Sequence, residues 1–162
     1  MARSFAANVL GGAKLLAAAG FCLAPSMAQA VSCTVATLPA NFGIYDPFQA
    51  TPASTTGEID VSCTCSVVDC IAFSFRVEIA AGASGSTAAR QMRSGAASLQ
   101  YNLYLDPGYR SIWGIGSEGY SVLYLIALFG SKQVTTVYAR MPAGQMAAPG
   151  VYSDAPVVTV SY

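Results

Sequence analysis

The stretch that decides the fold is Gly57-Glu58-Ile59-Asp60-Val61-Ser62-Cys63-Thr64-Cys65. Polar and apolar residues alternate along it, which is typical of a β-strand with one face in a core and the other in water. We therefore expect a strand over Gly57–Cys65, with Glu58 and Asp60 together on a solvated outer face. Cys63 and Cys65 lie two residues apart, so they belong to one face of this strand.

Similar segments rich in Val, Ile, Thr, Tyr and Phe follow the same pattern along the chain, and Gly, Pro, Asn and Ser separate them. These segments predict further strands at Ser32–Leu38, Ile71–Ala81, Ser98–Asp106, Tyr120–Phe129, Val134–Met141 and Val151–Tyr162. We expect Tyr120–Phe129, which is apolar on both faces, to be a central strand, with Val134–Met141 returning from it as a hairpin. About seven strands at this spacing predict an all-β, immunoglobulin-like antiparallel sandwich.

Residues 1–30 have the pattern of a secretory signal peptide: two positive charges, an apolar run over 15–24, and Ala28-Gln29-Ala30 as a cleavage site. We expect cleavage after Ala30 and one domain over residues 31–162. An N-terminal membrane anchor is the alternative, but the apolar run is shorter than the ~20 residues of a membrane span. Cleavage would remove Arg3 and Lys14 but no acid, which leaves a net charge of −2.

Four cysteines follow the leader, namely Cys33, Cys63, Cys65 and Cys70, and four cysteines allow three connectivities. We favour Cys33–Cys63, which would tie the first strand to the second, and Cys65–Cys70, which would close a tight turn. A metal site built from Cys63, Cys65 and Cys70 is the alternative. Export favours disulfides, and the chain contains no His to complete a metal site.

The composition argues against several classes of function. The 162 residues include 8 basic and 8 acidic side chains and no His. Nucleic-acid binding needs a basic excess, and many enzymes use His as their general base. The run Gly114–Gly119 matches the G-x-G-x-x-G pattern of dinucleotide sites, but a strand rather than a helix is expected after it. We therefore expect no catalytic residues, no cofactor and no metal.

Segments along most of the chain together resemble the spore coat protein U domain, which also builds the subunits of archaic (Csu-type) chaperone–usher pili. The matching segments are Cys33–Val35, Phe42–Pro47, Gly57–Cys63, Arg90–Met92, Leu99–Tyr104, Trp113–Gly116, Met141–Gln145, Gly150–Asp154 and Val157–Tyr162. The resemblance implies an immunoglobulin-like sandwich that lacks its final strand. It also implies a Cys33–Cys63 disulfide, with Cys65–Cys70 as an addition.

The resemblance further implies partners: a periplasmic pilus chaperone, an outer-membrane usher and other pilus subunits. The chain would be exported through the periplasm to the cell surface, without stable membrane insertion. Val35, Val158, Val160 and Tyr162 would then line the groove that accepts a donor strand, and the Tyr162 carboxylate would anchor a basic chaperone residue.

One departure from the pilus pattern is expected at the N-terminus. A polymerising subunit needs about ten or more residues ahead of its first strand to donate. Cleavage after Ala30 would leave only Val31 and Ser32 before Cys33. This predicts a terminal, minor or adhesive subunit. The alternative is a free-standing secreted coat protein that associates with itself on the cell surface.

Overall fold

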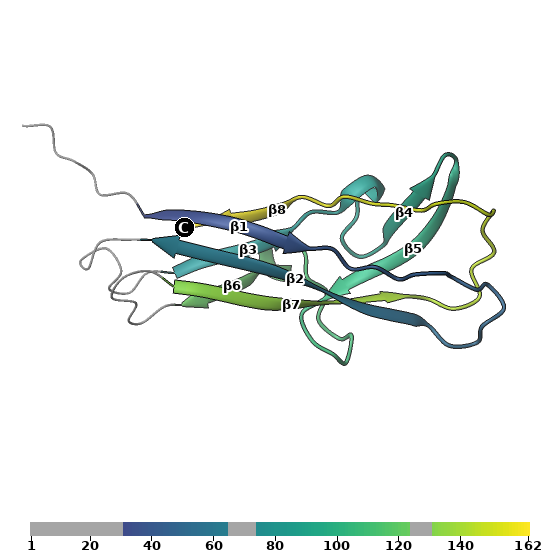
Figure 1. The fold of residues 1–162 in the computed structure, drawn as a ribbon, viewed down its shortest axis with the longest axis horizontal. Helices are drawn as coiled ribbons and strands as arrows, with labels where there is room; N and C mark the ends of the chain where they lie inside the picture. Colours follow the sequence, from purple (N-terminus) through teal and green to yellow (C-terminus); the bar gives the residue numbers. More distant parts are fainter. Residues whose placement is uncertain (1–30, 65–73, 124–130) are drawn as a thin grey trace, which may run out of the picture.

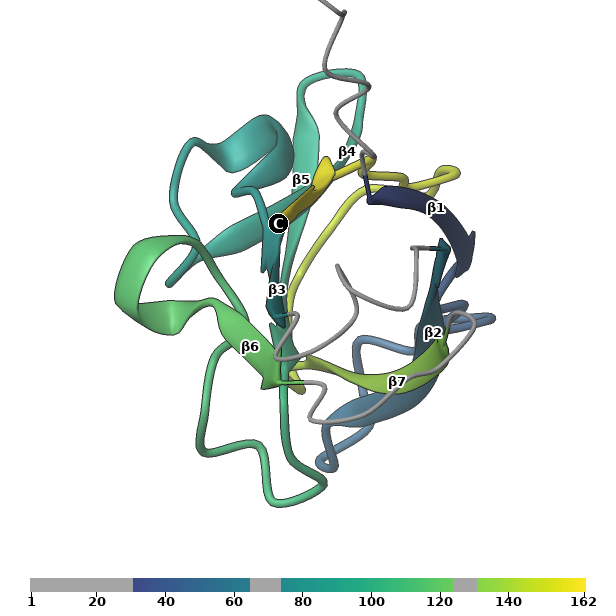
Figure 2. The same cartoon turned by 90° about the vertical axis from the view of Figure 1, so that its left-hand side faces the viewer.

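A computed structural model describes residues 31–64, 74–123 and 131–162, and every described element is a strand or a short 3-10 turn. Two antiparallel sheets face each other in an immunoglobulin-like sandwich (Figures 1 and 2). The five-stranded sheet has the order β1-β2-β7-β5-β4, and the three-stranded sheet has the order β6-β3-β8. The strands are β1 (Ser32–Leu38), β2 (Ala53–Thr64), β3 (Ser74–Ile79), β4 (Arg90–Ser94), β5 (Ala97–Tyr104), β6 (Tyr120–Leu123), β7 (Ser131–Met141) and β8 (Val158–Ser161).

The core lies between the two sheets and follows the period-two alternation of the strands. Its largest member is Trp113, which is fully buried and donates its indole N–H to the backbone oxygen of Val77 at 3.1 Å. Each of β2, β3, β5 and β7 contributes every second residue. These inward residues are Ile59, Val61, Cys63, Phe75, Val77, Ile79, Leu99, Tyr101, Leu103, Val137, Ala139 and Met141.

A buried arginine joins the end of β3 to β4 and β5. The Arg90 guanidinium donates to the backbone oxygens of Ile79 (2.8 Å), Ala80 (3.0 Å) and Trp113 (2.8 Å). It also donates to Oδ1 of Asn102 at 2.7 Å. Burial lowers the pKa of Arg90, yet a guanidinium with its donors satisfied remains charged at neutral pH. Arg90 therefore supplies hydrogen-bond donors to several backbone oxygens in the interior.

The prediction of an all-β, immunoglobulin-like sandwich is confirmed, and β1 has the predicted bounds. The predicted outer face of β2 is also confirmed, because Asp60 is partly exposed and forms an ion pair with Lys132 at 2.6 Å. The segment Ile71–Ala81 begins in a part that lies outside the described residues; within the described part the strand is Ser74–Ile79.

The predicted hairpin between Tyr120–Phe129 and Val134–Met141 is wrong. In the described residues β6 pairs with β3 in one sheet, whereas β7 pairs with β2 and β5 in the other. The expected central position of Tyr120–Phe129 is not found in its described part either, because β6 lies at the edge of its sheet while β7 lies inside the other. Proximity in sequence therefore did not fix the pairing. The last predicted strand is also shorter than expected. The segment around Ser153 bridges β4, and only Val158–Ser161 pairs with β3.

Candidate functional site

The inner face of the sandwich is uncovered beside β1. Val35 lies opposite Val61 in the β1–β2 ladder, so both side chains point toward the core. Val61 is 2% exposed, whereas Val35 is 43% exposed. The difference arises because β1 is the edge of its sheet, and no described strand pairs with its outer side. An apolar inward residue at such an edge is a place where another strand can pack.

The same residues of β1 also offer backbone groups at this edge. The Cα atoms of Cys33 and Cys63 are 4.0 Å apart, the short spacing of a non-hydrogen-bonded pair. Hydrogen-bonded and non-hydrogen-bonded pairs alternate, so Val35 and Thr37 are also non-hydrogen-bonded toward β2. Their N–H and C=O groups therefore point to the outer side of β1.

Strand β8 forms the corresponding edge of the other sheet. The N–H of Ala80 donates to the backbone oxygen of Val157 at 2.9 Å, which makes this a hydrogen-bonded pair. The next pairs, Ile79–Val158 and Val77–Val160, alternate with it, so the backbone groups of Val158 and Val160 face away from β3. The side chains of these two valines pack on the core. Among the described residues nothing pairs with this second side of β8.

An apolar groove of about 340 Å³ opens between these edges, toward the end where β1 finishes and β8 begins. Its floor comes from buried residues of β2, β3, β5 and β7, and its walls come from residues 37–40 and 154–158. The groove-lining side chains include Ile59, Ile79, Leu103, Val137, Val158, Met92 and Phe42. Both views place β1 and β8 at neighbouring edges of the two sheets, and the two strands run in opposite directions (Figures 1 and 2).

A polar network fixes the wall of the groove that leads into β8. The Tyr101 hydroxyl donates to Oδ2 of Asp154 at 2.8 Å, and Oδ1 of Asp154 accepts the backbone N–H groups of Ala83 (3.0 Å) and Ala155 (2.9 Å). Burial raises the pKa of Tyr101 far above its usual value, and the bond to Asp154 acts in the same direction. Tyr101 therefore stays protonated and keeps donating, which holds the chain direction into β8.

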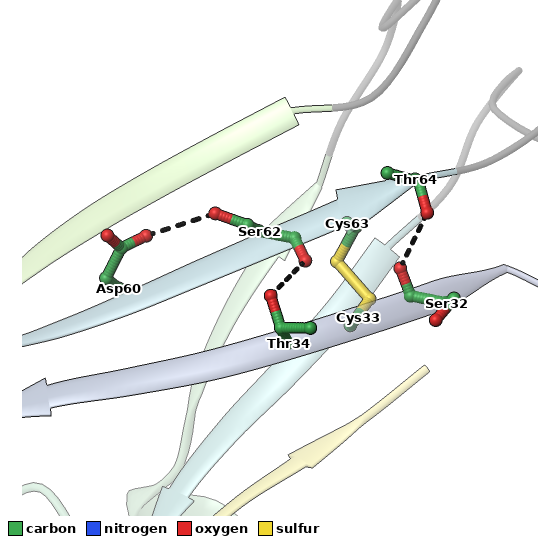
Figure 3. The surroundings of a disulfide bond; sticks show 7 residues. All are labelled: Ser32, Cys33, Thr34, Asp60, Ser62, Cys63 and Thr64. Carbon is green, nitrogen blue, oxygen red and sulfur yellow. Dashed lines mark hydrogen bonds between the residues drawn. A yellow bond between two sulfur atoms is a disulfide. The ribbon is translucent and has the colours of Figure 1, made fainter.

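A disulfide fixes β1, the strand that leads into the groove wall at residues 37–40. Cys33 on β1 is bonded to Cys63 on β2, directly across the ladder (Figure 3). On either side, the hydroxyl of Thr34 donates to the Ser62 backbone oxygen (3.3 Å) and that of Thr64 donates to the Ser32 backbone oxygen (3.4 Å). The edge strand is thus attached covalently to a strand that is paired on both sides.

A glycine lets the chain turn sharply at the end of β1. Gly57 occupies an inward position of β2, and a Cβ there would lie 2.6 Å from the backbone oxygen of Leu38 and 3.0 Å from the Ala40 nitrogen. Contacts this close exclude any side chain without backbone movement. The groove wall formed by residues 38–40 therefore depends on the absence of a side chain at position 57.

The structure places the residues that the sequence singled out as follows. The expected Cys33–Cys63 disulfide is confirmed, while Cys65, Cys70 and Ala30 lie outside the described residues. Val158 lines the groove and Val160 follows it on the same face of β8. Tyr162 lies just past β8 and is 61% exposed. Its role as an anchor stays a prediction.

Sequence reasoning missed several residues that shape the groove. Tyr101 and Asp154 are far apart in the chain, and no local pattern indicated their bond. Gly57 carried a usable signal, because a glycine inside an alternating strand marks a close approach of another backbone.

The described residues contain no helix long and apolar enough to cross a membrane. They also contain no group of three His, Cys, Asp or Glu side chains placed to hold a metal ion.

The fold defines a class: an immunoglobulin-like sandwich in which no described strand pairs with the outer sides of β1 and β8. The chain matches the family model of the Spore Coat Protein U domain over residues 19–159, and it therefore belongs to that family. The match includes residues 19–30, which the sequence predicts to be part of the leader.

Among solved structures, the chain is similar to one chain of the CsuC–CsuE chaperone–tip adhesion subunit pre-assembly complex from the archaic chaperone–usher Csu pili of Acinetobacter baumannii. The identity is 20% and the TM-score is 0.53, so this likeness concerns the fold. It covers 82% of this chain and 40% of that chain. No curated protein matches the sequence.

Proposed function

We propose that this chain is a structural or adhesive subunit of a chaperone–usher type pilus, completed by a β-strand from another polypeptide. The observation that carries the proposal is the uncovered inward face at Val35, next to the groove that Val158 lines on the other side. A strand placed there would cover apolar side chains and pair with the outward backbone groups of both edges.

The geometry sets requirements for the inserted strand. Because β1 and β8 run in opposite directions (Figure 1), one strand between them is parallel to one edge and antiparallel to the other. Its apolar residues must recur at every second position, because only one of its faces meets the groove. An inserted segment with this pattern would bury its apolar side chains in the groove and pair its backbone groups with those of the two edges.

The family, and the chaperone–subunit complex to which the chain is similar, support the proposed partners. A periplasmic chaperone would fill the groove first, and a segment of another pilus subunit would replace it at an outer-membrane usher. The Tyr162 carboxylate is proposed to bind a basic residue of the chaperone. This route carries the chain through the periplasm to the cell surface, where it would serve in adhesion and biofilm formation.

The place of the subunit in a filament depends on its mature N-terminus. Cleavage after Ala30 would leave Val31 and Ser32 ahead of Cys33, too few residues to donate a strand, and would assign a terminal or minor place. Mass spectrometry of the exported protein decides this. A mature chain that begins well before Val31 would remove the argument.

The proposal is tested by paired substitutions that place a charge on one face or the other of the same strand. Val35→Lys and Val160→Lys put an ammonium group on the inward face beside the groove, whereas Ala36→Lys and Thr159→Lys put it on the outer face. Co-purification with the cognate chaperone should be lost for the two inward variants and kept for the two outward controls. Equal capture of all four variants would contradict strand insertion at this site.

The state of the unpartnered chain separates the two candidate functions. A subunit awaiting a strand should aggregate on its own and become soluble with a chaperone or an alternating apolar peptide. A stable, cooperatively unfolding monomer or dimer without any partner would favour the free-standing coat protein instead.

A further inference from the structure

A second cavity opens mainly on the outer face of the five-stranded sheet, and it shares one lining residue, Tyr101, with the groove. It measures about 330 Å³, at the small end of ligand-binding pockets, which range over roughly 300–1,000 Å³. Its floor is formed by outward residues of β5 and β7 together with the inward Tyr101, and small residues from three loops form its walls. The lining residues are Pro52, Ala88, Ala89, Gln100, Tyr101, Asn102, Tyr104, Arg140, Pro142 and Ala143.

Arg140 is the only charged side chain among these lining residues. It is half-buried, and its guanidinium lies 5.0 Å from the centre of the Tyr109 ring. In the described parts of the chain it makes no ion pair and donates no hydrogen bond. The other two arginines with reduced exposure are satisfied by the protein: Arg76 pairs with Glu78, and Arg90 donates to carbonyl groups. The N–H groups of the Arg140 guanidinium therefore lie at the cavity wall, and no described residue accepts a hydrogen bond from them.

The surroundings of Arg140 are ordered before any ligand arrives. Tyr109 stacks edge-on against Tyr104, with ring centres 5.4 Å apart, and so supports the ring under Arg140. Asn102 is fixed by Arg90 and by its own donation to the Ala88 backbone oxygen at 3.0 Å. Gln145 joins the Gln100 backbone to Pro142 through two hydrogen bonds. The floor and two walls of the cavity are thus held by hydrogen bonds and ring contacts within the domain.

We propose that this cavity binds a carboxylate carried on a single sugar-sized ring, as in a hexuronic acid unit. The planar guanidinium fork of Arg140 matches a carboxylate with two parallel hydrogen bonds. One cation without a second charge beside it suits a single negative charge better than a phosphate dianion. The walls of Pro52, Ala88, Ala89 and Ala143 offer apolar contact to the C–H face of a sugar ring, and Tyr104 adds an aromatic surface.

The experiment is an NMR titration of the exported chain, purified with any polypeptide that fills its groove. D-glucuronate is the probe, D-glucose is its neutral counterpart, and acetate carries the carboxylate without the ring. Glucuronate should shift the amides of β5 and β7 around Asn102 and Arg140, with binding at least about tenfold tighter than that of either control. Equal binding of glucose, or no shift at saturating glucuronate, would overturn the proposal.

Substitutions localise the binding. Arg140→Gln should weaken glucuronate binding about tenfold or more, and Ala89→Leu should weaken it by filling the cavity while Arg140 stays in place. Arg110→Gln is the matched control, because Arg110 is an exposed arginine nearby in sequence to Tyr109 and lies outside the lining. If the Arg140 variant fails to fold, the Ala89 variant still decides. Unchanged binding in a folded Arg140→Gln or Ala89→Leu variant would refute the assignment.

Discussion

Removing the Cys33–Cys63 disulfide should destabilise the domain by an amount that depends on the number of residues between the two cysteines. The two cysteines are separated by 30 residues. The loop-entropy relation gives about 12 cal/mol/K for a loop of this length, or about 3.6 kcal/mol at 25 °C. A domain of this size loses roughly 4 °C of melting temperature per kcal/mol, so the expected shift is about 14 °C.

The assay is urea unfolding of the exported chain, wild type against a Cys33→Ala, Cys63→Ala double variant. Alanine at both positions avoids leaving a lone thiol or a buried hydroxyl beside Val61. Cys65 and Cys70 stay in both proteins, so the difference reports on one bond. Both measurements must use the same groove-filling partner at the same concentration, because binding alone shifts apparent stability.

A loss below about 1 kcal/mol would refute the loop-closure reasoning. Amide exchange then shows what the bond does instead. If exchange rises in β1 alone while β7 keeps its protection, the disulfide only holds an edge strand in place. If protection falls in both strands together, the bond contributes to the stability of the whole domain, as the loop argument requires.

Three other substitutions test the fold and the groove. Arg90→Met should cost at least about 3 kcal/mol in urea unfolding, because it removes the donors to the backbone oxygens of Ile79, Ala80 and Trp113. An exposed Arg93→Met variant should change little. The pKa of Tyr101 is raised in the folded state, so its contribution to stability is complete below the unfolded pKa of 10.0 and is lost as pH rises above that value. The free energy of unfolding, measured between about pH 8 and pH 11, should fall at alkaline pH, and Tyr101→Phe should reduce this fall. An identical pH dependence in the two proteins would contradict this. Gly57→Ala should destabilise the domain by about 1–3 kcal/mol and weaken capture by the chaperone, because the added Cβ would collide with the Leu38 backbone. Thr56→Ala, on the outer face of β2, is the control for both measurements.

Alternation along single segments predicted most of the strands, because each strand has one buried and one solvated face. It predicted β1 with correct bounds and the outer face of β2. Strand β4 was not predicted, since Arg90–Ser94 carries few of the residues typical of strands. Its place depends on Arg90, whose hydrogen bonds reach residues 10 to 23 positions away, and local patterns do not encode such contacts.

The candidate site was predictable in part for the same reason. Alternation places the valines of β8 on one face, but only the family resemblance implied that they and Val35 line a groove. The disulfide was favoured from cysteine placement and was also implied by the resemblance. The wall at Asp154 depends on a bond to Tyr101 across 53 positions, which only the folded chain brings together. The sheet that β6 or β7 joins likewise depends on which of several apolar strands it pairs with, and the sequence of a single segment does not determine that.

In the proposed pilus, the Cys33–Cys63 bond would have a mechanical consequence. Tension on a strand seated beside β1 would load the backbone hydrogen bonds of Val35 and Thr37. From there it would pass through β1 to β2 along the ladder and one covalent link. β2 in turn shares an eleven-residue register with β7. At Cys33 the edge strand is therefore bonded covalently to β2, and load that reaches this point passes to the centre of the sheet.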